Sequence, residues 1–195
     1  MSNSVGEMNG GYAKLTDKNG VELYMLKEAD TAKFRIAFDL VNPNYDLNKA
    51  IGFKLFALMA QLNSDVIESC TISSYDDSSS EVDMGLLFRR FGSDFGLAQK
   101  YIYAHSVMRR TGLETTMETK QIQRPDDFTV PRGSEPALGS ASNLVIRLTD
   151  NHHGEVLYDF VLVLEEDVPI YMEKMPGSLM HKVFSRLKVF IETLV

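Results

Sequence analysis

Cysteine, basic residues and long apolar runs are all scarce in this chain, and each shortage excludes a class of protein. Cys70 is the only cysteine, so an internal disulfide is impossible, and its surroundings show no metal-binding spacing. Lys and Arg number 20 against 27 Asp and Glu, which gives a net charge of -7. Nucleic-acid binding is therefore not expected, because phosphates demand basic surfaces, and an anionic membrane is unsuited as a permanent site.

The sequence also lacks the signals that would direct it into or across a membrane. No apolar run approaches the ~18–20 residues of a membrane-spanning helix. The N-terminus has no basic region followed by an apolar block, so no secretory signal is expected. Together with the single cysteine, these shortages predict a cytoplasmic protein in a reducing environment.

What the sequence does contain is enough apolar material for one domain. Of its 195 residues, 44% are hydrophobic and 24% are charged, which is typical of a globular chain with a substantial core. Residues 1–11 are small and polar without periodicity, and we expect a flexible tail there. The domain is expected at 12–195.

Alternating apolar and polar residues predict a series of strands. The clearest alternation is at 33–40, where Phe34, Ile36, Phe38 and Leu40 share one face. Further strands are expected at 20–25, 66–73, 81–89, 95–109, 114–121, 143–148 and 156–165. The segment 125–140 has three prolines and is predicted to be a loop, whose length suggests a function.

Two segments have helical rather than strand periodicity. Asp46 stands at an N-cap position before apolar residues at helical spacing, which predicts a helix over 46–62. Pro176-Gly177 opens a second helix with a wide apolar stripe that runs to Val195. A single long helix laid across a curved antiparallel sheet leaves an apolar hollow between them. The order therefore predicts an α+β helix-grip fold, a curved antiparallel β-sheet wrapped around a long C-terminal α-helix.

This order and several short motifs resemble the START (steroidogenic-acute-regulatory-related lipid transfer) domain family. The similar segments are Asp17–Tyr24, Ile67-Glu68-Ser69, Gly92-Ser93-Asp94-Phe95, Thr119–Pro125 and Pro131-Arg132-Gly133, and the resemblance covers 14–195. The chain departs from the family's pattern in having no tryptophan and no arginine in the motif at 92–95. The resemblance implies a hydrophobic tunnel that carries one lipid, sterol or similar molecule, with no particular ligand specified.

Alternation also predicts which side chains would line that cavity. On the strand at 95–109, we take Lys100 to mark the outward face, so Tyr101, Tyr103 and His105 are expected to point inward. Their polar tips would suit an apolar ligand with one hydroxyl or headgroup, although ordinary half-buried aromatics would give the same pattern. The predicted ligand-binding residues are Met84, Leu86, Phe88, Leu97, Gln99, Tyr101, Tyr103, His105, Met117, Tyr158, Phe160, Leu162, Met180, Val183, Phe184 and Leu187.

The sequence favours binding over catalysis without deciding between them. It has no Gly-x-Ser-x-Gly elbow and no phosphate loop, and His152-His153 have no further ligand at metal spacing, so no metal and no cofactor are expected. The favoured function is non-catalytic transfer or sensing of a hydrophobic small molecule. One alternative is a cyclase-like or hydrolase-like enzyme that pairs His105 with Glu118 or Asp159. The other is an interaction module with a closed cavity.

Entry of a ligand requires movable backbone. The segments 125–140 and 168–177 are predicted to be the gate, because they can move without breaking a strand ladder. Apolar residues in the second segment leave transient membrane contact open as a further interaction.

Overall fold

The computed structural model describes residues 11–73, 78–91, 93, 96–137, 139–164 and 172–195. In chain order its strands are β1 (Ala13–Lys18), β2 (Val21–Glu28), β3 (Thr31–Val41), β4 (Ile67–Ile72), β5 (Glu81–Phe88), β6 (Lys100–Thr111), β7 (Glu114–Gln121), β8 (Glu135–Pro136), β9 (Ala141–Leu148) and β10 (His153–Val163). The helical elements are the 3-10 turn η1 (Leu47–Lys49) and the α-helices α1 (Lys54–Leu62) and α2 (Met175–Glu192).

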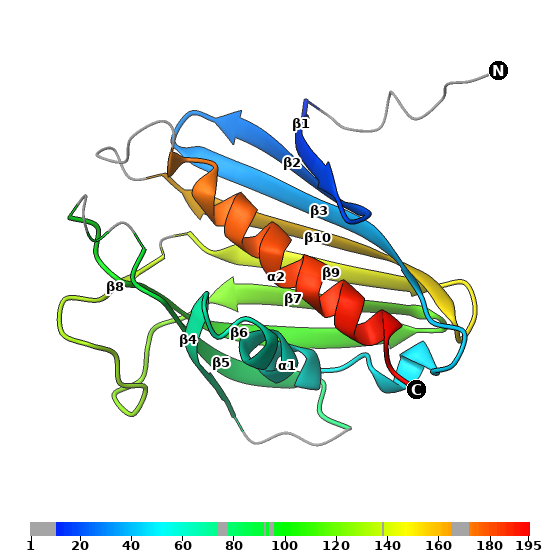
Figure 1. Cartoon of the computed structure of the whole chain (residues 1–195). Helices are drawn as coiled ribbons and strands as arrows, with labels where there is room; N and C mark the ends of the chain where they lie inside the picture. Colours follow the sequence, from blue (N-terminus) through cyan, green and yellow to red (C-terminus); the bar gives the residue numbers. More distant parts are fainter. Residues whose placement is uncertain (1–10, 74–77, 92, 94–95, 138, 165–171) are drawn as a thin grey trace.

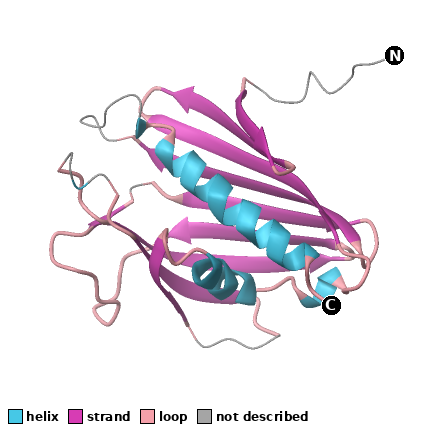
Figure 2. Cartoon of the chain, viewed as in Figure 1, coloured by secondary structure: helices cyan, strands magenta, loops and turns pink. Residues whose placement is uncertain are grey.

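The described strands form one curved sheet with both α-helices on the same face (Figures 1 and 2). Its order is β1-β2-β3-β10-β9-β7-β6-β5-β4, and β8 pairs with β6 off this path. All neighbours along the path are antiparallel, while β8 is parallel to β6. Helix α2 runs across the concave face, as Figure 1 shows. The predicted helix-grip architecture is confirmed.

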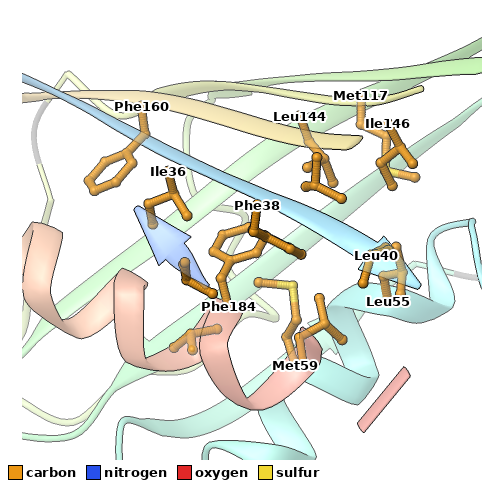
Figure 3. Close-up of a cluster of buried hydrophobic side chains, with 14 of the residues drawn as sticks. Ile36, Phe38, Leu40, Leu55, Met59, Met117, Leu144, Ile146, Phe160 and Phe184 are labelled. Atoms are coloured by element: carbon orange, nitrogen blue, oxygen red, sulfur yellow. The ribbon is translucent and has the colours of Figure 1, made fainter. Parts of the chain in front are cut away.

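The pairing of β3 with β10 joins the two halves of the chain. Phe34 lies opposite Phe160 and Ile36 opposite Tyr158 in this register. The Phe34 and Phe160 rings stack with their centroids 4.9 Å apart. The alternation predicted at 33–40 is confirmed, because Phe34, Ile36, Phe38 and Leu40 are all buried. Figure 3 shows Ile36, Phe38 and Phe160 among the buried side chains near α2.

The predicted helix over 46–62 is wrong in its first half. The Asp46 side chain accepts a hydrogen bond from the Asn48 N–H, but it caps only the short turn η1. Gly52 then has a φ of 157°, which ends the helical path before α1 begins. The Leu55 N–H donates to the Gly52 carbonyl and not to that of Ile51, which instead accepts from Arg110 of β6 at 2.6 Å. A contact from a distant strand thus interrupts the periodic segment.

Other boundaries shift by a few residues. The strand expected from residue 95 begins at Lys100, and the one expected at 143–148 begins at Ala141. The strand expected at 156–165 begins at His153. Strand β1 was not predicted, although it lies within the expected domain. Residues 1–10 of the predicted tail lie outside the described residues.

Buried polar side chains fix α2 in place. The Asn42 amide, which is fully buried, donates to the Ile191 carbonyl at 2.7 Å and the Leu194 carbonyl at 2.9 Å. The Ile191 carbonyl also accepts from the Leu194 N–H, so Asn42 adds a second partner at the C-terminus of the helix, where intrahelical partners run out. His181 Nε2 lies 3.0 Å from the Val21 carbonyl of β2. The helix is therefore held in register by hydrogen bonds as well as by apolar packing.

Gly177 sets the closest approach of α2 to the sheet. A Cβ atom on Gly177 would lie 2.5 Å from Cδ1 of the buried Phe34 ring.

We expect Gly177→Val to destabilise the protein by about 1–3 kcal/mol, because the stacked Phe34 ring cannot move without disturbing Phe160. Urea unfolding measures this cost. The exposed neighbour offers a matched control, Ser178→Val, and equal losses in both variants would contradict the packing explanation.

A second contact ties α2 to the turn before β4. Lys182 Nζ lies 2.6 Å from Asp65 Oδ2, and the Arg186 guanidinium also binds this carboxylate. The hydrogen bonds from Arg186 and Lys182 hold the pKa of Asp65 below its usual value, and Arg186 contributes more to this shift than Lys182. The ionised carboxylate therefore stabilises the fold.

This pKa shift predicts a pH dependence with a definite sign. A carboxylate whose pKa is lower in the folded state contributes stability above its unfolded pKa of about 3.9 and loses it as the pH falls through the folded value. Asp65→Asn should be less stable than the wild type at neutral pH, and the difference should shrink below about pH 4. Urea unfolding of both proteins across this range tests it. A difference that stays constant on acidification would contradict the ion-pair explanation.

Candidate functional site: an apolar pocket under helix α2

A pocket of about 250 Å³ lies between the sheet and the N-terminal half of α2. Helix α2 contributes Met175, Pro176, Leu179 and Met180, and α1 contributes Phe56 and Met59. The strands contribute Met84, Leu86 and Phe88 from β5, Lys100, Ile102 and Ala104 from β6, and Tyr158, Phe160 and Leu162 from β10. The volume lies just under the ~300–1,000 Å³ typical of ligand sites.

Small side chains in the centre of the sheet create this space. Ala104 of β6, Thr119 of β7 and Ser142 of β9 face the pocket and form its floor. Toward the other end of the sheet the inward positions hold large side chains, among them Met117, Leu144 and Ile146, which Figure 3 shows in the packed core. A void of only about 20 Å³ remains beside them, against Phe184 and Leu187. The inner face is therefore filled at one end and hollow at the other.

The polar groups of the floor are hydroxyls. Ser106 Oγ and Thr119 Oγ1 lie 2.9 Å apart and are buried. The Tyr158 and Ser142 side chains both line the pocket. Burial raises the pKa of Tyr158 above its usual value, and the neighbouring Ser142 hydroxyl only partly opposes that shift. Tyr158 is thus a neutral phenol at physiological pH.

Three charged side chains among the described residues reach the pocket wall, and each has a partner outside it. Lys100 Nζ lies 2.8 Å from Glu135 Oε2. Glu173 accepts from Lys27 at 2.7 Å. Arg89 donates to the Ser64 carbonyl at 2.9 Å and lies 3.7 Å from the Glu68 carboxylate. These charges are paired, so the apolar wall is not opposed by isolated ions.

Half of the predicted ligand-binding residues lie on the pocket wall. These are Met84, Leu86, Phe88, Leu97, Tyr158, Phe160, Leu162 and Met180. Met117, Val183, Phe184 and Leu187 belong to the packed core beside it. The Gln99 amide donates instead to the Phe88 carbonyl at 2.7 Å and to the Glu68 carboxylate at 3.0 Å.

The predicted inward face of β6 is the outward one. Lys100 does not mark the solvent side, because its apolar stem lines the pocket while its ammonium group reaches Glu135. The inward residues are therefore Ile102 and Ala104, and Tyr101, Tyr103 and His105 point away from α2. Ile102 and Ala104, together with Thr119 and Ser142, are among the wall residues that the sequence argument missed. The available signal for Ile102 and Ala104 was the alternate set of residues on the same strand. The signal for Thr119 was its position two residues after the predicted Met117.

The outward tyrosines pack against a loop. The Phe128 ring, from the predicted loop at 125–140, lies 5.2 Å from the Tyr103 ring and 6.2 Å from the Tyr101 ring, measured between centroids. Phe128 is buried there, and the Arg124 guanidinium donates to its carbonyl at 3.1 Å. The tyrosines thus attach a loop to the outer face of the sheet.

His105 forms neither of the acid–base pairs considered from the sequence. Its Nδ1 lies 2.7 Å from Asp83 Oδ1 on the outer face. Glu118 binds Arg109 at 2.9 Å, and Asp159 binds Arg35 at 2.7 Å. His105 is therefore not on the pocket wall. Within the described residues no group of three or more potential metal ligands occurs, and no helix is long and apolar enough to cross a membrane.

Both segments predicted as the gate border the pocket. Ala137 and Ser140 come from 125–140, and Met172, Met175 and Pro176 come from 168–177. Residues 168–171 lie outside the described part of the chain. Movement of these segments stays a prediction.

Solved structures with this architecture are numerous. The STAR-related lipid transfer protein of Xanthomonas axonopodis (fragment 25-204) superposes with a TM-score of 0.71 at 13% identity, over 94% of this chain and 99% of that one. The chain has the START fold. The human StarD13 lipid transfer and protein localization domain gives 0.67 at 10% identity, over 94% and 90%, and human STARD10 gives 0.67 at 12% identity, over 93% and 75%. No family model and no curated protein matches the START-fold chain in sequence.

The Phe128 ring packs against the outer face of the sheet at a position that requires glycine at residue 85. A Cβ on Gly85 would lie 2.2 Å from Phe128 Cε2. We expect Gly85→Ala to destabilise the wild type but to be favourable by roughly 0.5–1 kcal/mol after Phe128→Ala, because alanine is otherwise preferred to glycine in a strand. A double-mutant cycle by urea unfolding measures the coupling. If the changes in unfolding free energy are additive, Phe128 does not pack against Gly85 in solution.

Proposed function

We propose that the chain binds one hydrophobic small molecule in the pocket under α2 and carries or senses it without chemical change. The observation that carries the proposal is the unfilled apolar space between α2 and the sheet. A packed core of this size normally has few voids larger than a water molecule. An interaction module with a closed cavity would have filled this space with side chains.

Three further observations support this function. The Xanthomonas protein and the human StarD13 domain of the same fold are named for lipid transfer. The described side chains on the pocket wall are mostly apolar. The charged side chains on the wall are bound in ion pairs with residues outside it. Both observations favour ligand binding over acid–base catalysis. Ser106 and Thr119 bond to each other, and no activating base contacts either in the described residues.

We place this function in the cytoplasm, in agreement with the single unpaired cysteine.

Filling the pocket tests the proposal. Ala104 is on the floor, so Ala104→Phe would place a ring where the ligand body lies. We expect the wild type to bind at least one member of a panel of 1-nonanol, cholesterol and dioleoylphosphatidylcholine, and Ala104→Phe to weaken that binding at least about tenfold. Calorimetric titration serves for the alcohol, and native mass spectrometry serves for the two lipids.

Two controls separate occupancy from unfolding. Tyr103→Phe alters the outer face of the same strand and should bind as the wild type does. Ala104→Leu fills less space and should weaken binding by an intermediate amount, with cooperative unfolding retained. If the wild type binds no member of the panel, or if Ala104→Phe binds equally well, the proposed function is wrong.

A further inference from the structure

We infer that the pocket selects a small, uncharged ligand: an apolar body of roughly ten non-hydrogen atoms with one hydroxyl or carbonyl group, held by hydroxyl side chains of the pocket floor. This inference rests on the proposed function and specifies its ligand class. It depends on two features of the pocket, its volume and the chemistry of its floor.

The volume limits the size of an enclosed ligand. An apolar protein cavity of about 150 Å³ accepts benzene, which corresponds to ~25 Å³ for each non-hydrogen atom. By this ratio the 250 Å³ of the pocket accommodates roughly ten such atoms. A sterol or a lipid with two acyl chains contains several times that number. A single medium-length chain or a compound of two fused rings is of the right size.

A row of hydroxyl groups crosses the floor on three adjacent strands. Ser106 of β6 lies opposite Thr119 of β7, and Thr119 lies opposite Ser142 of β9. Tyr158 of β10, the strand next to β9, extends the row on the same wall. The row therefore consists of four hydroxyls, three of which (Thr119, Ser142 and Tyr158) lie on the pocket wall.

This row has hydrogen-bonding capacity to spare. Each hydroxyl offers one proton and two lone pairs, and the bond between Ser106 and Thr119 uses only part of that supply. A ligand hydroxyl can donate to one member and accept from another, and a carbonyl can accept. Since the rest of the wall is almost wholly apolar, the row is where the polar end of the ligand binds.

In the part of the chain that the structure describes, the floor offers no charged group to compensate a charge. The described charged residues on the wall, Arg89, Lys100 and Glu173, bind Glu68, Glu135 and Lys27. A carboxylate that entered as far as Ser142 would lose its hydration without gaining a cation, which is costly in an apolar site. Tyr158, whose pKa is raised by burial, stays protonated and adds no charge of its own. The ligand is therefore neutral.

A homologous series of ligands tests size and charge together. Calorimetric titrations with 1-hexanol, 1-nonanol and 1-dodecanol should show affinity rising to 1-nonanol and then no further rise, because additional carbons no longer find wall to contact. Nonanoate at neutral pH should bind at least about tenfold more weakly than 1-nonanol. Cholesterol and dioleoylphosphatidylcholine should bind more weakly still.

Substitution of the tyrosine tests the row. Tyr158→Phe should weaken 1-nonanol binding about fivefold to tenfold, which is the effect expected from one neutral hydrogen bond. Binding of nonane should be unchanged, since it makes no such bond. A structural disturbance would weaken both ligands alike. Tyr103→Phe, on the outer face, is the matched control and should alter neither.

Each contrary result overturns a different part of the inference. Tight binding of cholesterol or the phospholipid that Ala104→Phe abolishes would overturn the size limit and leave the proposed function standing. Equal binding of nonanoate and 1-nonanol, or no effect of Tyr158→Phe, would overturn the hydroxyl row as the anchor. Absence of binding by every compound would instead overturn the proposed function itself.

Discussion

The distance between α2 and the sheet is the constraint on which the pocket depends. At the C-terminal half of the helix, Phe184 and Leu187 pack against large inward side chains of the sheet. Near its start, Gly177 lets the helix touch Phe34 of β3. The helix therefore cannot settle closer to the sheet anywhere along its length. Where the sheet carries Ala104, Thr119 and Ser142, none of the described side chains reaches across, and a space remains.

Hydrogen bonds from buried side chains make this spacing specific. Asn42 binds the last carbonyls of α2, and Asn63 donates to the Met59 carbonyl of α1 at 2.9 Å and to the Val183 carbonyl of α2 at 3.5 Å. Both asparagines are fully buried, so a shift of α2 would weaken or break their bonds to it, and a buried amide without a partner costs about 1–3 kcal/mol. Apolar packing alone would tolerate small slides of α2. The amides fix one position and thereby fix the shape of the pocket.

Residues whose environment is local were predictable from the sequence. The alternation of Phe34, Ile36 and Phe38 requires only that one face of the strand is buried, and the structure agrees. The helix at 46–62 failed because Arg110, which lies far along the chain, binds the Ile51 carbonyl, and no local pattern reveals such a contact. The face of β6 was mistaken because Lys100 buries its stem and exposes its charge. A lysine near a strand end therefore does not identify the outward face.

The two sides of the pocket differ in rigidity, and this difference bears on selectivity. The floor is part of a continuous strand ladder, so Thr119, Ser142 and Tyr158 have fixed positions. The remaining wall includes Met59, Met84, Met172, Met175 and Met180, whose unbranched side chains adapt to different shapes. A fixed polar row opposite an adaptable apolar wall discriminates strictly by the position and charge of the ligand's polar group. It discriminates only loosely by the shape of the apolar body. Related molecules with one common polar end would then be accepted by the same site.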